Sequence, residues 1–186
     1  MGEIGTTTSY VIQHDTESCI GCYACVVACM DQNDVEIEES PALWRQVYTL
    51  ESKVGPQWRI QYFSLACLHC ADAPCLLACP TGAINKSLTT GAVVVQSELC
   101  IGCRSCSMAC PFGVPRFGKT GTMQKCHLCH VRVESGLQPA CVRVCPTGAL
   151  RFGNPNQLGF ETGQRRASQL VEAANSANKA GSTAGI

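Results

Sequence analysis

The cysteines of this chain constrain its fold more than any other feature. Sixteen of the 186 residues are cysteines, and they fall into four groups of four. Groups one and three both read C-x2-C-x2-C-x3-C, the spacing that holds cubane iron–sulfur clusters in bacterial ferredoxins. The sequence therefore predicts four 4Fe-4S clusters, and with them the movement of electrons. The groups are Cys19, Cys22, Cys25 and Cys29 (one); Cys67, Cys70, Cys75 and Cys79 (two); Cys100, Cys103, Cys106 and Cys110 (three); and Cys126, Cys129, Cys141 and Cys145 (four).

The spacing within a group also predicts that groups work in pairs. Three cysteines two residues apart wrap a short loop around one face of a cubane, and each iron takes one thiolate. The fourth cysteine lies about one helical turn further on and cannot reach the same cube; in two-cluster ferredoxins it binds the other cluster. Four groups should therefore form two pairs.

Internal repeats indicate that the chain arose by duplication. Cys-Ile-Gly-Cys occurs at 19–22 and at 100–103, and Cys79 and Cys145 both begin Cys-Pro-Thr-Gly-Ala. Proline also follows Cys110, and its fixed φ and missing N–H turn the chain away after the ligand. Cys29 departs from this pattern because Met30 follows it.

Disulfide bonds and zinc sites explain the cysteine pattern less well than iron–sulfur clusters do. Disulfides suit small secreted domains, but no secretory apolar segment opens the given sequence, and closely spaced runs of four make poor disulfide partners. Zinc ribbons use separated C-x2-C pairs without a following proline. Group four, with its long gap before Cys141, resembles a zinc site only when it is considered alone.

Composition points to a protein whose clusters act as its core. Aromatic residues make up only 6% of the chain, so little ordinary apolar core is available and folding should depend on metal. Lys and Arg equal Asp and Glu at 14 each, and no basic stripe with interleaved aromatic residues predicts nucleic-acid binding. The apolar stretches are too short to span a bilayer.

The remaining pattern predicts an α+β fold with little regular structure and a C-terminal tail. Leu43–Leu50 and Trp58–Ala66 read as strands around a Lys-Val-Gly-Pro turn, and Ala92–Gln96 as a third strand. Short helices should follow the third cysteine of each group. Residues 1–153 form the expected cluster domain and 154–186 a tail, disordered by default, with 161–180 as one weak helix. We expect this tail to dock on a partner.

Several polar residues are candidates for tuning the clusters or meeting a partner. Arg165 and Arg166 would anchor the tail to the partner by charge, and Leu170 and Val171 by a small apolar contact.

Three histidines are adjacent to ligand cysteines and either donate to cluster sulfurs or, more commonly, pack beside them; His14 has no such context. Three cations either raise cluster potentials, meet a partner or lie in solvent. These six residues are His69, His127, His130, Arg104, Lys119 and Lys125.

The order of the four groups over residues 15–153 resembles the four-cluster electron-transfer subunits of molybdenum and tungsten bis-pterin oxidoreductases, the family of the dimethyl sulfoxide reductase iron–sulfur subunit. The resemblance implies two pseudo-symmetric ferredoxin-like modules, in which groups one and four pair and groups two and three pair. It also implies a path from cluster 1, nearest the catalytic subunit, to cluster 4. The implied ligands are Cys19, Cys22, Cys25 and Cys145 for cluster 1; Cys126, Cys129, Cys141 and Cys29 for cluster 2; Cys67, Cys70, Cys75 and Cys110 for cluster 3; and Cys100, Cys103, Cys106 and Cys79 for cluster 4. Cys103 stands where some relatives have tryptophan and a three-iron cluster, so four cubanes are expected.

The resemblance also implies what the chain works with. Its partner would be a molybdenum- or tungsten-pterin catalytic subunit, for example that of a tungsten aldehyde oxidoreductase with a flavin subunit. The chain would be non-catalytic by itself. Because the given sequence shows neither an export signal nor an anchor helix, the expected location is cytoplasmic; export with a signal-bearing partner is the alternative. Two other functions stay open: a diffusible polyferredoxin, and copies stacked into a conducting filament.

Overall fold

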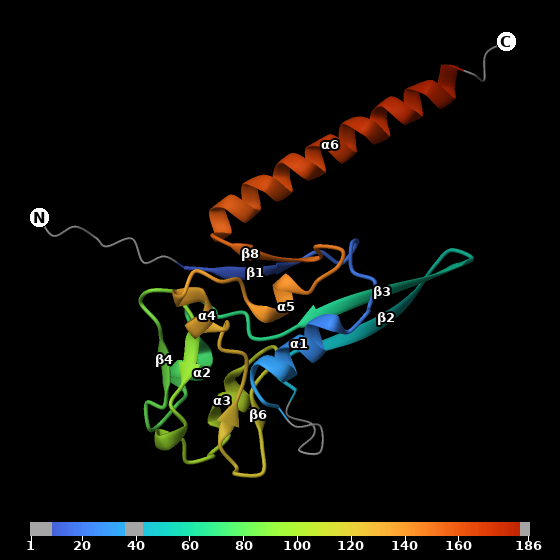
Figure 1. Ribbon diagram of the computed structural model, residues 1–186. Helices are drawn as coiled ribbons and strands as arrows, with labels where there is room; N and C mark the ends of the chain where they lie inside the picture. Colours follow the sequence, from blue (N-terminus) through green and yellow to red (C-terminus); the bar gives the residue numbers. More distant parts are fainter. Residues whose placement is uncertain (1–8, 36–42, 183–186) are drawn as a thin grey trace, which may run out of the picture.

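The computed structural model describes residues 9–35 and 43–182, which include all sixteen cysteines, with side chains as far as residue 176. Short helices and two-stranded antiparallel ladders make up a compact body, and one long helix leaves it (Figure 1). The strands are β1 (Val11–His14), β2 (Gln46–Val54), β3 (Gln57–Leu65), β4 (Ile84–Lys86), β5 (Val93–Val95), β6 (Arg116–Phe117), β7 (Met123–Gln124) and β8 (Leu150–Gly153). The helices are α1 (Ala24–Gln32), α2 (Pro74–Leu77), α3 (Ser105–Ala109), α4 (His130–Glu134), α5 (Ala140–Arg143) and α6 (Pro155–Ser182), with a 3-10 turn at Ser97–Leu99.

Two of the ladders join the cysteine groups in pairs. β1 leads into group one and pairs with β8, which follows group four, in the register Val11↔Gly153 to His14↔Leu150. β4 follows group two and pairs with β5, which precedes group three. Helix α1 lies against α5, and α2 against α3. We call these parts the one–four half (β1, β8, α1, α5) and the two–three half (β4, β5, α2, α3). Strands β1, β4, β6, β7 and β8 lie in segments where alternation predicts no strand.

The ligand loops of groups one and three repeat one backbone shape. Gly21 and Gly102 both have φ 68°, and Tyr23 and Arg104, which precede the helices, have φ 61° and 66°. A Cβ at position 102 would lie 2.6 Å from the Gly121 carbonyl oxygen. Glycine is required there both for the positive φ and for the close approach of two backbones.

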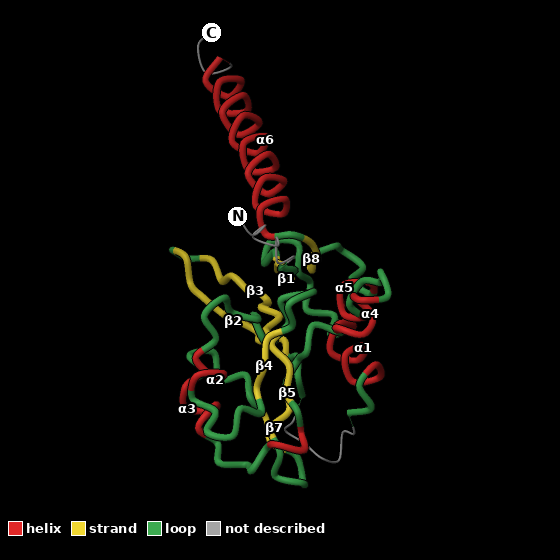
Figure 2. Tube along the Cα trace, turned by 90° about the vertical axis from the view of Figure 1, so that its left-hand side faces the viewer, coloured by secondary structure: helices red, strands yellow, loops and turns green. Residues whose placement is uncertain are grey.

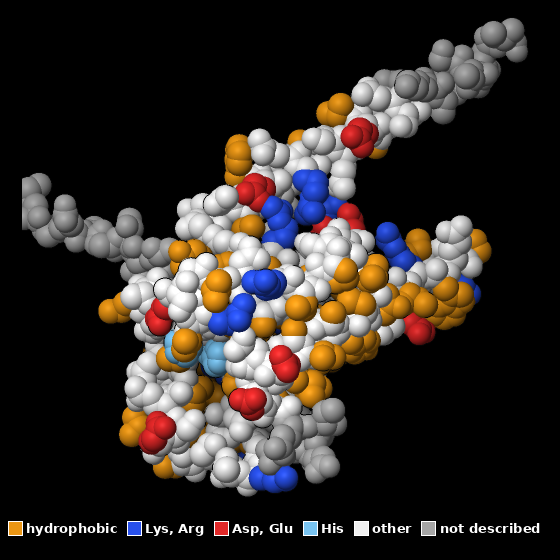
Figure 3. Space-filling model, viewed as in Figure 1, with side chains coloured by type: hydrophobic (Ala, Val, Ile, Leu, Met, Phe, Trp, Pro, Cys, Tyr) orange, Lys and Arg blue, Asp and Glu red, His pale blue; other side chains and the backbone are white. Residues whose placement is uncertain are grey.

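The predicted hairpin is present, with shifted bounds. β2 and β3 pair over nine residues each, from Gln46↔Leu65 to Val54↔Gln57. Gly55, at φ 60°, turns the chain at the tip. The hairpin extends away from the body and carries exposed apolar side chains (Figures 1 and 3). The third expected strand is also present, shortened to β5, and the expected helices begin at or just before the third cysteine of each group rather than after it.

The buried core is small and largely made of sulfur-bearing and small side chains. One cluster of packed side chains contains Cys25, Val26, Cys141 and Leu150, and belongs to the one–four half. The other contains Ala73, Ile84, Val93, Cys106 and Met123, in the two–three half and the nearby strand β7. Ligand cysteines thus occupy the positions where a protein of ordinary composition would place aliphatic residues.

The default expectation of a disordered tail is wrong, because residues 155–182 form helix α6 (Figure 2). The alternative, a helix at 161–180, is confirmed with wider bounds. Pro155 starts the helix, and the Asn154 side chain accepts a hydrogen bond from the Asn156 N–H at 2.9 Å, which caps the first turn. Leu158 is buried against Gly153. The expected role of Arg165 and Arg166 is also corrected: they pair with Asp15 (2.8 Å) and Glu17 (2.5 Å) of the same chain.

Beyond these ion pairs, α6 projects from the body in both views (Figures 1 and 2). Leu170 and Val171 lie on this projecting part and are exposed. None of the helices in the described part of the chain, α6 included, is long and apolar enough to cross a membrane.

Candidate iron–sulfur sites

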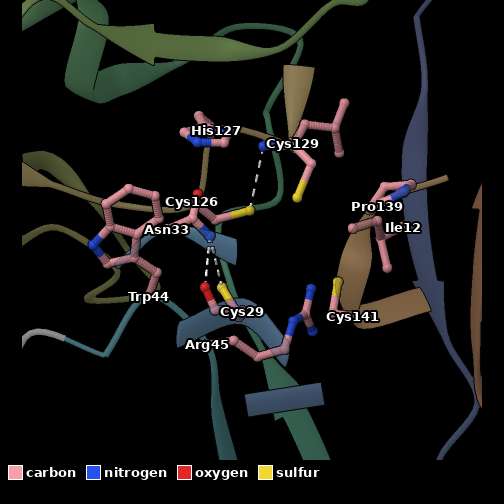
Figure 4. A pocket seen from close by; sticks show the side chains of 11 residues that line it. Ile12, Cys29, Asn33, Trp44, Arg45, Cys126, His127, Cys129, Pro139 and Cys141 are labelled. Carbon is pink, nitrogen blue, oxygen red and sulfur yellow. Dashed lines mark hydrogen bonds between the residues drawn. The ribbon is translucent and has the colours of Figure 1, made fainter. Parts of the chain in front are cut away.

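Three cavities in the body are each lined by four cysteines from two different groups. In the first cavity the thiols point inward, as Figure 4 shows. The empty space within each, including its open mouth, is about 290, 320 and 390 Å³. The three quartets are Cys29, Cys126, Cys129 and Cys141; Cys79, Cys100, Cys103 and Cys106; and Cys67, Cys70, Cys75 and Cys110.

Of the other four cysteines, Cys25 and Cys145 come together where α1 lies against α5. Cys25 and Cys145 belong to the same group of packed side chains as Leu150. Cys19 and Cys22 lie on the loop before α1, where Cys22 is exposed. The structure therefore brings Cys25 and Cys145 together, 120 residues apart in sequence, at the junction of group one with group four.

The donor set and its spacing suit a group larger than a single ion. All sixteen cysteines are free thiols. Over the residues that the structure describes, no three His, Cys, Asp or Glu side chains come close enough together to hold one metal ion, which for zinc requires sulfurs about 2.3 Å from the metal. Each cavity instead gathers four thiols around one space. Four thiols in this arrangement match a cubane, with one thiolate for each iron.

Arg45 is a buried cation beside the first cavity that the sequence reasoning missed. Arg45 is 3% exposed, donates to Ser64 Oγ at 2.9 Å and lines the first cavity together with Cys141. Burial raises the pKa of the Cys126 and Cys141 thiols, and the Arg45 charge opposes that rise. A guanidinium here favours thiolates and an anionic cluster. No local pattern in the sequence marks Arg45, because its burial depends on contacts with Ser64 and with cysteines of groups one and four.

Backbone N–H groups point at one sulfur in each of the three cavities. Leu128 donates to Cys126 Sγ at 3.4 Å, Met123 to Cys100 Sγ at 3.3 Å and His69 to Cys67 Sγ at 3.5 Å. Hydrogen bonds to ligand sulfur stabilise the more negative, reduced state of a cluster and raise its potential.

The repeated Cys-Pro-Thr segment supplies hydroxyl groups to sulfur, a role the sequence reasoning did not assign. Thr81 Oγ1 lies 3.6 Å from Cys79 Sγ, and Thr147 Oγ1 lies 3.8 Å from Cys145 Sγ. Burial opposes the effect, but the threonine and backbone hydrogen bonds lower the pKa of both thiols. The threonine two residues after the ligand therefore favours the thiolate at both copies of the repeat.

The candidate histidines differ in what they touch. His69 is buried, its Nε2 lies 3.7 Å from Cys126 Sγ, and desolvation holds its pKa well below the usual value. His127 packs edge-on against Trp44 and His130, with ring centroids 5.3 and 5.1 Å apart. Of the three, His69 therefore contacts a ligand sulfur, whereas the other two pack against aromatic rings.

The three candidate cations lie in different surroundings. Lys125 is buried and donates to the Cys126 carbonyl at 3.1 Å. Arg104 lies over the Phe117 ring, 5.2 Å from its centroid, at the second cavity. Lys119 is exposed on the turn between β6 and β7. Lys125 is thus the candidate cation buried among the ligands.

Comparison with known proteins agrees with this chemistry. A family described as "4Fe-4S dicluster domain" matches residues 58–155, and a "4Fe-4S binding domain" matches residues 16–30. The chain belongs to the 4Fe-4S dicluster family. It is 40% identical to the B subunit of anaerobic dimethyl sulfoxide reductase from Haemophilus influenzae, over 83% of this chain and 78% of the relative. It is 39% identical to the thiosulfate reductase electron transfer subunit of Salmonella typhi, over 92% and 90%.

A third relative extends the same class. The iron–sulfur subunit of nitrate-inducible formate dehydrogenase from Escherichia coli is 37% identical over 84% of this chain, which spans 58% of that relative. The resemblance predicted from the cysteine groups is confirmed. The protein is an iron–sulfur electron-transfer subunit, its cofactors are four 4Fe-4S clusters, and it is non-catalytic by itself.

Proposed function

We propose that this chain relays electrons, one at a time, between a molybdenum- or tungsten-pterin catalytic subunit and a second redox partner. The four quartets hold the clusters numbered above, with cluster 2 in the first cavity, cluster 4 in the second and cluster 3 in the third. The crossed arrangement follows the ferredoxin rule, because the fourth cysteine of each run joins the other cluster. Cluster 1 takes Cys19, Cys22, Cys25 and Cys145.

The exposure of the ligands carries the proposal. Among the sixteen cysteines only Cys22 and Cys103 are exposed. Cys22 belongs to cluster 1 and Cys103 to cluster 4, the two ends of the proposed path. The ligands of cluster 2 are all buried, and those of cluster 3 are all half-buried. Electrons therefore have an entry and an exit at opposite ends of a row whose middle is shielded from solvent.

Contacts along the row support its order. Cys25 of cluster 1 packs in the same group as Cys141 of cluster 2. His69 lies in the sequence between Cys67 and Cys70 of cluster 3, and its ring contacts Cys126 of cluster 2. Cys106 of cluster 4 shares its packed group with Cys70 and Cys75 of cluster 3. These shared packed groups and the contact of His69 with Cys126 support placing each cluster beside the next.

We also infer that the two halves are related modules. Each has one C-x2-C-x2-C-x3-C group, one Cys-Pro-Thr-Gly-Ala segment and one antiparallel ladder joining them. The matching φ values of the ligand loops support duplication of a ferredoxin-like unit.

The catalytic subunit would dock at cluster 1. Ile20, Tyr23 and Val27 are exposed around Cys22, and the apolar hairpin β2–β3 adjoins them because the Tyr23 hydroxyl donates to the Val47 carbonyl. The distal part of α6 would be a second contact with the partner, since Leu170 and Val171 are exposed on it. A cytoplasmic location stays a prediction.

Anaerobic purification of the tagged full-length chain from its own cells tests this proposal. We expect it to bring down a larger subunit with molybdenum or tungsten and a fluorescent pterin after oxidation, at a stoichiometry of one to one. Size-exclusion mass separates the alternatives. A lone chain near 19.8 kDa that exchanges electrons with many acceptors would indicate a diffusible polyferredoxin, and a high-mass homopolymer would indicate a filament; either result contradicts the proposal.

A further inference from the structure

His69 touches two ligand cysteines that lie 59 residues apart in sequence. Its backbone N–H donates to Cys67 Sγ at 3.5 Å. Its ring Nε2 lies 3.7 Å from Cys126 Sγ. One residue therefore contacts sulfur in the third cavity through its main chain and sulfur in the first cavity through its side chain.

The proton of the ring is placed by a third contact. The backbone N–H of Val93, on β5, donates to His69 Nδ1 at 2.9 Å. Because Nδ1 accepts, the neutral ring carries its hydrogen on Nε2. That hydrogen faces Cys126 Sγ, so His69 donates to the sulfur and fixes the direction of the bond.

The surroundings hold the ring in this one position. His69 is 5% exposed and has φ 49°, a conformation that few residues other than glycine adopt. Lys125 donates both to the Val93 carbonyl and to the Cys126 carbonyl (3.1 Å). Val93 and Cys126, the two partners of the ring, are thereby tied together by the same ammonium group.

We propose that His69 is a positioning residue that bridges clusters 2 and 3 and forms the hydrogen-bonded path for the electron between them. The path runs from Cys67 Sγ through the His69 main chain and ring to Cys126 Sγ. It is covalent throughout except for one hydrogen bond at each end. One electron leaves one cluster and reduces the other, and His69 keeps its proton throughout. The inference rests on the ligand assignment proposed above.

The bridge has a second consequence, for the potential of cluster 2. A donor to Cys126 stabilises the extra negative charge of the reduced cluster. Removing the ring should make the midpoint potential of cluster 2 more negative. Clusters 1 and 4, which His69 does not touch, should keep theirs.

The first experiment uses the unaltered, cluster-loaded complex. Histidine labelled with 15N in the ring only is incorporated, and pulsed electron paramagnetic resonance is recorded at potentials where each cluster is reduced in turn. We expect a ring-nitrogen coupling on the signal of cluster 2. Absence of that coupling overturns the proposal, and because no residue is changed, misfolding cannot account for the result.

Variants then separate bridging from mere packing. His69→Leu should abolish the coupling, lower the potential of cluster 2 alone and slow electron transfer between the two ends of the chain, at unchanged iron content. His69→Gln, which keeps an N–H donor, should recover part of the potential and rate. His130→Leu is the matched control, since His130 also adjoins a ligand but packs against the His127 ring, and it should change neither.

Two results would contradict the bridge or its premise separately. Unchanged potentials and transfer rate in fully loaded His69→Leu would refute the bridge while leaving the relay function intact. A ring-nitrogen coupling that survives undiminished in Cys29→Ser would mean that Cys29 is not a ligand of that cluster. The assignment of ligands would then fail, although the contact between His69 and the Cys126 cluster would stand.

Discussion

The same cysteine spacing produces two different helices in the two halves of the molecule. In the one–four half, α1 runs through nine residues and passes Cys29 to end at Gln32. In the two–three half, α3 has five residues and ends at Ala109, before Cys110. The difference lies in the next residue: Met30 continues the helix, whereas Pro111 has no N–H and stops it. One substitution in a repeated motif thus decides the length of a helix.

The longer helix gives cluster 2 surroundings that cluster 3 does not share. The extra turn carries Asn33 to Cys29, where Nδ2 donates to the carbonyl at 2.6 Å and lies 3.7 Å from Sγ. Arg45 adds a buried charge to the same cavity. The third cavity is lined instead by a buried ammonium group, that of Lys125, which favours the thiolates of Cys67 and Cys75. Identical ligand motifs therefore place clusters in different electrostatic surroundings, which set different potentials.

Loss of a crossing ligand should have the largest effect. Cys29→Ser should disrupt cluster 2, which the chain builds mainly from residues 126–141, and leave the cluster held by Cys19, Cys22 and Cys25 in place. Cys110→Ser should do the same to cluster 3. Iron and sulfide analysis should fall by about four from about sixteen of each. Loss of the cluster held by Cys19, Cys22 and Cys25 in Cys29→Ser would reject the crossed scheme.

Met30→Pro tests the helix comparison directly. It should impose the group-three ending on group one and destabilise the fold by about 3 kcal/mol or more, because α1 would lose an interior N–H and meet a carbonyl clash. Pro111→Met is the matched control and should cost much less. Anaerobic denaturant unfolding measures both, and equal losses for the two variants would show that the proline does not set the helix length.

Removing the buried charge should act mainly on the first cavity. Arg45→Gln should make the potential of cluster 2 more negative and lower the free energy of unfolding by roughly 1.5–3 kcal/mol, the range for a hydrogen bond to a charged group. Arg45→Lys keeps the charge and should restore part of both. Redox titration followed by paramagnetic resonance measures the potentials. A shift of cluster 4 as large as that of cluster 2 would argue against a local effect.

Two truncations of α6 should have the smallest effects on the clusters and differ from one another. Ending the chain after Gln169 keeps the ion pairs to Asp15 and Glu17, so stability should change little while assembly with the partner weakens. Ending it after Gly153 also removes buried Leu158, a side chain worth about 1.5–3 kcal/mol. All four clusters should remain in both. Full assembly of both shortened chains, measured by size-exclusion mass, would show that α6 is not a docking element.

Much of the site was determined by the sequence alone. The number of clusters and the family were predicted from the cysteine groups, because a cubane needs thiolates at short fixed separations. The assignment of each cysteine to a particular cluster came from the family resemblance and stays a prediction. The hairpin and β5 followed from alternation of residues. Met30 in place of proline was visible in the sequence too. Its consequence, a longer α1 that brings Asn33 to Cys29, became clear only in the folded structure.

Tertiary structure decided everything that depends on contacts distant in sequence. Arg45 can act on the first cavity only because folding buries it beside Cys141. His69 meets Cys126 across 57 residues. The first turns of α6 are held by Asp15, Glu17 and the surface at Gly153. Local spacing can specify which atoms bind a cluster, but the charges and donors that tune it come from other segments, and only packing brings these together.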